Sequence, residues 1–189
     1  MNYVIEISEY FDRLKQTLDS VDQNDFNTLI NLLVAAKNAN KQIFIMGNGG
    51  SAATASHFVC DFNKGVSLLE EKKFKFICLN DNIPSLMAYA NDISYDDIFV
   101  YPLSTYFNPG DIVIGISGSG NSRNVIKALE YANENNGITI GLTGYDGGKV
   151  KQLCNHNIHI SIDDMQLTED LHMILGHCMM QILHKYQDN

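Results

Sequence analysis

Residues 42–51 read QIFIMGNGGS, and residues 111–122 read DIVIGISGSGNS. Each stretch opens with a short apolar run and closes in a turn of glycine, serine and asparagine. Short apolar runs that end at such turns predict buried strands. Because a segment of helical periodicity follows each turn, the two stretches predict two strand–turn–helix units of one parallel sheet.

Outward from these stretches, apolar runs and helical periods alternate along the chain. Strands are expected over residues 42–46, 74–79, 111–116, 137–143 and 157–162. Helices are expected over residues 2–18, 24–39 (capped by Asp25), 51–63, 84–90, 95–106, 122–135, 149–154 and 165–186. Apolar strands separated by helices favour parallel pairing, right-handed crossovers and helices on both faces. The predicted fold class is therefore α/β: a three-layer, flavodoxin-like sandwich with a five-stranded parallel sheet, plus an N-terminal helical pair (about 1–40), in a single domain over 1–189.

Composition excludes several classes of function. The chain has 189 residues, 45% of them hydrophobic, and a net charge of −9, which disfavours a nucleic-acid surface. No segment approaches the roughly 18 consecutive apolar residues of a membrane span. The N-terminus lacks the basic and apolar regions of a signal peptide. The four scattered cysteines form no CxxC pair and are expected to be free thiols. These features predict a cytoplasmic protein without nucleic-acid or membrane partners.

The two glycine/serine turns, Gly47–Ser51 and Ser117–Ser122, are the candidate ligand site. In open α/β sheets, ligands lie beyond the carboxyl ends of the strands. Ser51 is expected to cap the helix after the first turn, where free amides favour an anion. Neither turn has the lysine of a P-loop or the spacing of a dinucleotide motif, so no nucleotide cofactor is expected. The alternative is that these residues serve only as turn chemistry.

Five blocks of sequence carry a resemblance to a known family. They read GNGGSAATASHF at 47–58, ND at 91–92, SGSGNSRNVIKAL at 117–129, GLTGYDGGK at 141–149 and TEDLHMILGH at 168–177. With these blocks in order over nearly its whole length, the chain resembles the sugar isomerase (SIS) domain family and, within it, the phosphoheptose isomerases. The resemblance implies an aldose–ketose isomerase that converts sedoheptulose 7-phosphate to D-glycero-D-manno-heptose 7-phosphate, for lipopolysaccharide or capsule. It also implies a homotetramer with active sites between subunits.

The resemblance assigns roles residue by residue. It implies phosphate contacts from Ser51, Ser117, Ser119 and Ser122, with Gly49, Gly50 and Gly118 in the same loops, and sugar contacts from Asn48, Asp92 and Glu169. It implies catalysis by Asp61 and His177. Some members of the family bind zinc, and the matching positions are His57, Asp61, Glu169 and His177.

The residues themselves are suited to isomerisation. The reaction moves a proton between C1 and C2 through an enediol, and it needs a base and an acid that a carboxylate and a histidine can supply. His57 and Asp61 are four residues apart on one predicted helix and share a face. We expect Asp61 to be the base and His177 the acid. In the alternative readings, His57 is a core histidine, Asp61 a solvated residue, and His177 part of an apolar helix stripe.

The chain departs from the family pattern near the presumed sugar end. Asp61 stands where the family has glutamate, Glu169 where it has glutamine, and Gly118 where it has threonine. Leu167 stands where the family has an arginine just before that glutamine. A second family arginine is absent from the stretch 63–65, where Lys64 is the candidate substitute. Glu169 and His177 are eight residues apart, about 12 Å along a straight helix, which one ion cannot easily bridge. Either the helix bends, the ligands come from different subunits, or only a subset of the four residues binds. Because aspartate stands at the position of the base, a non-catalytic SIS protein that binds a protein partner, such as a replication initiator, is the alternative function.

Overall fold

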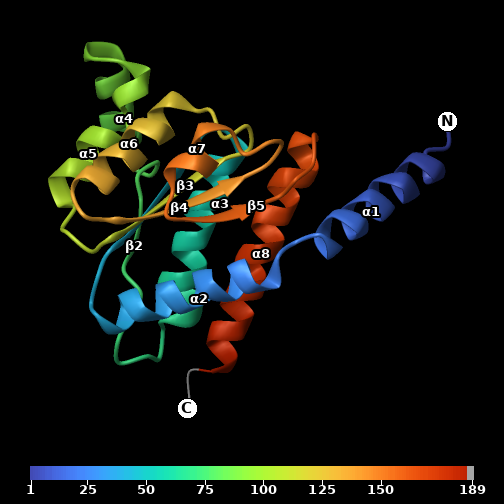
Figure 1. The fold of residues 1–189 in the computed structure, drawn as a ribbon, viewed down its shortest axis with the longest axis horizontal. Helices are drawn as coiled ribbons and strands as arrows, with labels where there is room; N and C mark the ends of the chain where they lie inside the picture. Colours follow the sequence, from blue (N-terminus) through green and yellow to red (C-terminus); the bar gives the residue numbers. More distant parts are fainter. Residues whose placement is uncertain (187–189) are drawn as a thin grey trace.

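The computed structural model describes residues 1–186 and contains one five-stranded, all-parallel sheet (Figure 1). Its strands are β1 (Ile43–Gly47), β2 (Phe76–Cys78), β3 (Ile112–Ser117), β4 (Ile138–Thr143) and β5 (His156–His159). Their order is β2-β1-β3-β4-β5, the flavodoxin-like order, with the reversal between β1 and β3. The predicted fold class is confirmed. The two turns quoted from the sequence lie side by side at this reversal, since Gly47 pairs with Ile116.

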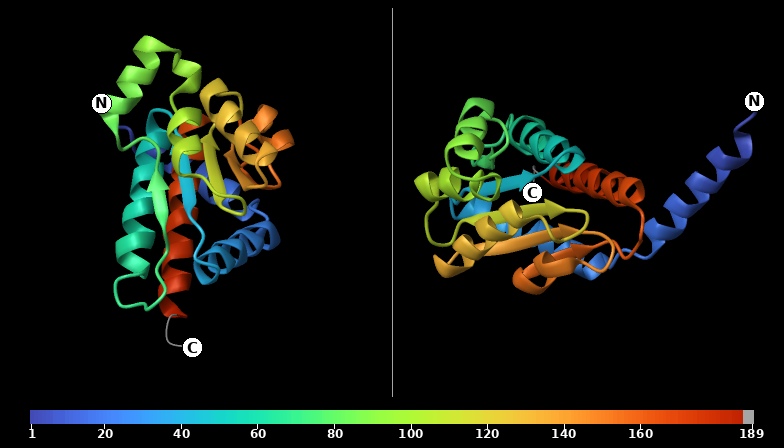
Figure 2. Two further views of the ribbon diagram at one scale, coloured as in Figure 1. Left: turned by 90° about the vertical axis from the view of Figure 1, so that its left-hand side faces the viewer. Right: turned by 90° about the horizontal axis from the view of Figure 1, so that it is seen from above.

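Helices cover both faces of the sheet (Figure 2). They are α1 (Val4–Asp19), α2 (Gln23–Asn38), α3 (Gly50–Cys60), α4 (Ile83–Asp92), α5 (Val100–Tyr106), α6 (Arg123–Glu134), α7 (Gly148–Leu153) and α8 (Met165–Lys185), with a 3-10 turn at Tyr95–Asp97. Side chains of β1 alternate between the two layers: Ile43 and Ile45 pack with α2, α3 and α8, whereas Phe44 and Met46 pack with α5, α6 and α7. The site is thus built on a rigid, doubly covered sheet.

Some element boundaries differ from the sequence-based expectation. The expected helix over 95–106 is the short turn Tyr95–Asp97 followed by α5. The expected cap Asp25 is wrong, because Asp22 accepts hydrogen bonds from the main-chain N–H groups of Asn24 and Asp25 and so starts α2 earlier. The strand expected over 74–79 is shortened to Phe76–Cys78, at the edge of the sheet.

The chain beyond α3 continues as a π-helix, Asp61–Val66, which is tied to that edge strand. Asn63 donates from Nδ2 to the Phe76 carbonyl at 2.8 Å and accepts the Phe76 N–H at Oδ1 at 2.9 Å. The ring of Phe62 stacks on that of Phe76, with centroids 4.5 Å apart. Asn63 therefore satisfies main-chain groups of an edge strand that would otherwise be open to another chain. It also fixes the turn on which Asp61 lies.

Helix α1 projects away from the body of the molecule (Figures 1 and 2). It is held near its middle by a hydrogen bond from the Tyr10 hydroxyl to Asp170 and an ion pair between Arg13 and Asp164. Large apolar side chains on this helix are exposed, namely Val4, Ile5, Ile7 and Phe11. No helix in the described part of the chain has the length and apolar character needed to cross a membrane.

Candidate active site

The first loop forms an anion-binding helix start. Gly49 has a φ of +56°, which favours glycine, and it is the N-cap residue of α3. The expectation that Ser51 caps this helix is wrong: the sharp turn at Gly49 starts the helix one residue earlier, and Ser51 lies buried inside the first turn. The first-turn N–H groups of α3 still point beyond the sheet edge, where they favour an anionic group.

The second loop brings two of the predicted serines together. The hydroxyl oxygens of Ser117 and Ser122 lie 3.1 Å apart, at the end of β3 and the start of α6. Gly120 has a φ of +67°, and a Cβ there would overlap the Gly147 carbonyl. At Gly118, where the family has threonine, a Cβ would lie 2.5 Å from the sulfur of Met165. A larger residue at position 118 would therefore require the Met165 side chain to move.

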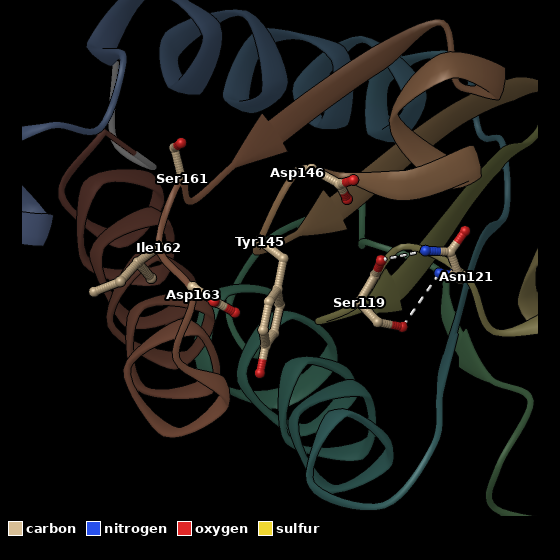
Figure 3. Close-up of a pocket in the computed structure, with 7 residues that line it drawn as sticks. All are labelled: Ser119, Asn121, Tyr145, Asp146, Ser161, Ile162 and Asp163. Carbon is tan, nitrogen blue, oxygen red and sulfur yellow. Dashed lines mark hydrogen bonds between the residues drawn. The ribbon is translucent and has the colours of Figure 1, made fainter.

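Ser119, in the same loop, lines an open cavity of about 650 Å³ (Figure 3). Its Oγ accepts a hydrogen bond from the Asn121 N–H at 3.3 Å. The cavity is lined by Ser119, Asn121, Tyr145, Asp146, Ser161, Ile162 and Asp163. The carboxylates of Asp146 and Asp163 in this lining disfavour a phosphate there, and the role of Ser119 in phosphate binding stays a prediction.

Three candidate residues meet where α3 packs on α8. The Nε2 atoms of His57 and His177 are 3.0 Å apart, and the Oδ2 of Asp61 lies 3.3 Å from the first and 3.8 Å from the second. Asp61 is half-buried, whereas both histidine side chains are about half exposed (43% and 51%). His57 is therefore not the core histidine of the alternative reading. A carboxylate beside two accessible imidazoles can exchange protons with a bound substrate.

Glu169 lies apart from this cluster, and including it among the metal ligands needs correction. A Cβ on Gly50 would overlap the Glu169 carboxylate, which places that group over the start of α3. The cluster of possible ligand atoms in the described residues contains His57, Asp61 and His177 without it. Glu169 and His177 are eight residues apart on the single helix α8, which places their side chains about 12 Å apart along its axis and keeps Glu169 out of the cluster. Within one chain, Glu169 faces the first loop instead.

Asp92 is not brought to the other candidates by any contact in residues 1–186. It is exposed at the end of α4, where its Oδ1 accepts from Asn91 at 2.7 Å. The 3-10 turn that follows does reach the first loop, because the Tyr95 hydroxyl donates to Asn48 Oδ1 at 2.9 Å. The role of Asp92 stays a prediction.

Two residues near the first loop were missed by the sequence reasoning. The side-chain amide of Asn48 pairs with that of Asn124, from the first turn of α6, through two hydrogen bonds of 2.9 Å. Asn124 is 1% exposed. The signal available in the sequence was an asparagine within the apolar face of a predicted helix. Asn124 and Tyr95 are the two side-chain partners of Asn48.

Comparison with known proteins places these features in a family. The family model described as SIS domain matches residues 9–144. The chain is 36% identical over 177 residues to a phosphoheptose isomerase of Aliarcobacter butzleri, covering 94% of this chain and 89% of the relative. It is 33% identical over 183 residues to a probable phosphoheptose isomerase of Thermoplasma volcanium, covering 97% and 93%.

Solved structures show the same architecture. Phosphoheptose isomerase from Neisseria gonorrhoeae superimposes with a TM-score of 0.88 at 26% identity, covering 97% of this chain and 100% of that one. With both the family model and full-length relatives above 30% identity, the chain belongs to the SIS-domain family and groups within it with the phosphoheptose isomerases.

Proposed function

We propose that this chain is an aldose–ketose isomerase that converts sedoheptulose 7-phosphate to D-glycero-D-manno-heptose 7-phosphate. The single observation that carries the proposal is the cluster of His57 on α3, Asp61 on its π-helical continuation and His177 on α8. The full-length similarity to phosphoheptose isomerases supports it. Supply of heptose for lipopolysaccharide or capsule remains an expectation from the family.

The geometry suits a proton transfer at one end of a substrate held by its phosphate at the other. The amides of α3 and the hydroxyls of Ser117 and Ser122 bind the phosphate. His57 lies six residues along α3 from Ser51, about 9 Å, a distance of the order that an extended seven-carbon sugar phosphate spans.

In the reaction, the Asp61 carboxylate removes the proton from the carbon next to the carbonyl, and His177 donates a proton to the carbonyl oxygen. The resulting enediol then collapses in the opposite sense. The former carbonyl carbon takes the proton that Asp61 carries, while His177 takes the hydroxyl proton from the neighbouring carbon, which becomes the new carbonyl. Both protons are thereby returned, so atoms and electrons balance without an added oxidant or reductant.

The test is an assay of the purified full chain with sedoheptulose 7-phosphate, followed by NMR. We expect an aldose signal to appear at equilibrium with the ketose, and exchange of the transferred proton with solvent deuterium, because a carboxylate base shares its proton with water in an open site. Other ketose phosphates serve as specificity controls. Binding of the sugar phosphate without turnover would contradict the proposal and favour the non-catalytic alternative.

We further propose that the cluster can hold a zinc ion with His57, Asp61 and His177 as its protein ligands. Tetrahedral zinc with bonds of about 2.0–2.1 Å places its ligand atoms roughly 3.3–3.4 Å apart. The three ligand-atom separations here are 3.0, 3.3 and 3.8 Å, and the residue types are those that zinc prefers. A bound zinc would polarise the substrate's carbonyl group in place of proton donation by His177, whose Nε2 would then be a ligand. The chain's own contribution is to aim the two imidazoles and the carboxylate at one point.

Zinc content is measured by elemental analysis on protein purified without a metal-affinity column. We expect about one zinc per chain, because three protein ligands suffice for an open zinc site. His57→Gln should lose the metal, whereas His184→Gln, an exposed histidine near the end of α8, should retain it. Equal zinc content in both variants, or none in the unmodified protein, would refute the site.

We also propose that the chain self-associates into a homotetramer, as the family resemblance implies. The exposed apolar residues of the projecting helix α1 support it, since a helix with such a face needs a partner surface. The mass of the full chain in solution, from light scattering, is the direct measurement. A monomer would contradict the proposal. Cytoplasmic localisation stays a prediction from sequence.

A further inference from the structure

One hydrogen-bond chain joins the two ligand loops. Its members are Asn48 in the loop after β1, Asn124 in the first turn of α6, and Tyr95 in the turn after α4. Asn124 Oδ1 also accepts the N–H of Val125 at 2.9 Å. Two segments outside the first loop therefore hold the Asn48 amide: Asn124 bonds both its oxygen and its nitrogen, and Tyr95 bonds its oxygen.

The orientation of both side-chain amides follows from the main-chain N–H of Val125, a group that can donate a hydrogen bond but not accept one. The N–H of Val125 requires the oxygen of Asn124 to face it, so this oxygen is Oδ1. The nitrogen of Asn124 then faces Asn48 and needs an acceptor there, which must be Asn48 Oδ1. The main chain of α6 thereby sets which way the amide of Asn48 points.

The oxygen of Asn48 is fully occupied in this arrangement. Its two lone pairs accept from Asn124 Nδ2 and from the Tyr95 hydroxyl, both at 2.9 Å. Of the two hydrogens on Asn48 Nδ2, one goes to Asn124 Oδ1, and no described residue accepts the other. Asn48 can therefore present only a donor to a ligand, which suits oxygen atoms of a sugar phosphate.

We propose that Asn124 and Tyr95 are positioning residues that orient the amide of Asn48 so that it donates its free N–H to the sugar-phosphate ligand. The inference rests on the proposed function for the role of Asn48 itself. Asn124 also links the first loop to the start of α6, which holds the donor at a fixed position relative to Ser117 and Ser122. Neither positioning residue touches the reacting atoms.

The test measures the Kd for sedoheptulose 7-phosphate by titration calorimetry, together with kcat and KM, in single and double variants. Asn48→Ala removes the donor itself, so its Kd gives the largest loss of binding that the positioning variants can cause through Asn48. We expect Asn124→Ala to weaken binding by about 10-fold, the loss of one well-placed hydrogen bond, and Tyr95→Phe by about 3-fold. KM should rise in step with Kd while kcat changes less, because the donor acts in binding.

The double variant separates positioning from general damage. If Asn124 acts through Asn48, then Asn124→Ala should add no more than about 2-fold in the Asn48→Ala background. Asn124→Asp keeps the side-chain shape and the acceptor for Val125 but removes the donor to Asn48. It should therefore weaken binding as well, and it serves as the second variant if the alanine variant fails to fold. Tyr101→Phe, an exposed tyrosine on α5 without contact to Asn48, is the control and should bind as the unmodified chain does.

The two proposals fail in different ways. Binding without turnover in the unmodified chain refutes the isomerase, while the variant series still tests the positioning residues through Kd. Unchanged Kd in Tyr95→Phe and Asn124→Asp, alongside weakened binding in Asn48→Ala, overturns the inference alone. Equal losses from Asn124→Ala in both backgrounds also overturn it, because they show an effect that bypasses Asn48. Absence of any binding by the unmodified chain overturns both.

Discussion

Asp61→Asn is expected to lower kcat for sedoheptulose 7-phosphate by roughly 10²–10⁴-fold, the range typical of losing a positioned general base. The asparagine keeps the shape of the side chain but cannot take a proton from carbon. KM should change little, because the proposed phosphate contacts lie in the two loops and Asp61 lies about three helical turns beyond the start of α3. Steady-state kinetics over a range of substrate concentrations checks both expectations.

Matched controls decide what the loss means. Asp12→Asn, on the exposed part of α1, should leave kcat unchanged. His177→Gln should lower kcat as strongly as Asp61→Asn, and the double variant should be little worse than either, since residues that act as one unit are not additive. Zinc content measured on the same samples separates the two roles of Asp61: full zinc with low kcat identifies the base. Near-normal turnover in Asp61→Asn would remove Asp61 from the mechanism.

The architecture was largely readable from the sequence because its signals are local. The apolar runs before Gly47 and Ser117 predicted β1 and β3, and the turns after them predicted the helix starts. Two errors are local, since Asp22 rather than Asp25 caps α2 and Gly49 rather than Ser51 caps α3. Strand β2 is also shorter than expected, and Asn63, not a further strand, pairs with the main chain of Phe76 at its outer edge. No periodicity in the sequence reports such a pairing.

The site was predictable to the extent that its residues share one element. His57 and Asp61 lie four residues apart on α3 and its continuation, so helical spacing alone placed them together. His177 joins them from 120 residues further along the chain, through the packing of α8 on α3. Only the family resemblance had named it. Asn124 was missed for a similar reason, since its pairing with Asn48 spans two loops and depends on the tertiary fold.

A second large effect is expected from a histidine that the proposed mechanism does not use. His172 lies on the inner face of α8 and is 1% exposed, and neither ring nitrogen has a hydrogen-bond partner in residues 1–186. Burial lowers the pKa of His172 to about 4, and the main chain of Thr143 opposes this in part. The protein thus holds a neutral imidazole in its core.

The sign of the pH dependence follows from this pKa. Above pH 6.5 the histidine is neutral in both the folded and the unfolded chain, so its protonation does not lower the free energy of unfolding. As the pH falls from 6.5 towards 4, the unfolded chain binds a proton that the folded chain cannot, and the free energy of unfolding decreases. The full loss is about 3 kcal/mol at pH 4, from about 1.4 kcal/mol per pKa unit. His159, next to Thr143, has a pKa lowered by burial and then by Lys151, and it acts in the same direction.

Urea unfolding of the unmodified chain and of His172→Leu, at several pH values between 7.5 and 4, isolates this contribution. The leucine variant should be at least as stable near neutral pH, because it buries no unpaired polar atoms. It should also lose about 3 kcal/mol less on acidification, while His159 and the carboxylates contribute equally to both curves. His172→Gln, which is neutral at every pH used, gives the same comparison if leucine packs poorly, and the exposed His184→Gln should keep the steep acid dependence. Parallel curves for the unmodified chain and both His172 variants would show that the acid sensitivity arises elsewhere. A shallower curve in both variants assigns the acid sensitivity to the buried imidazole of His172.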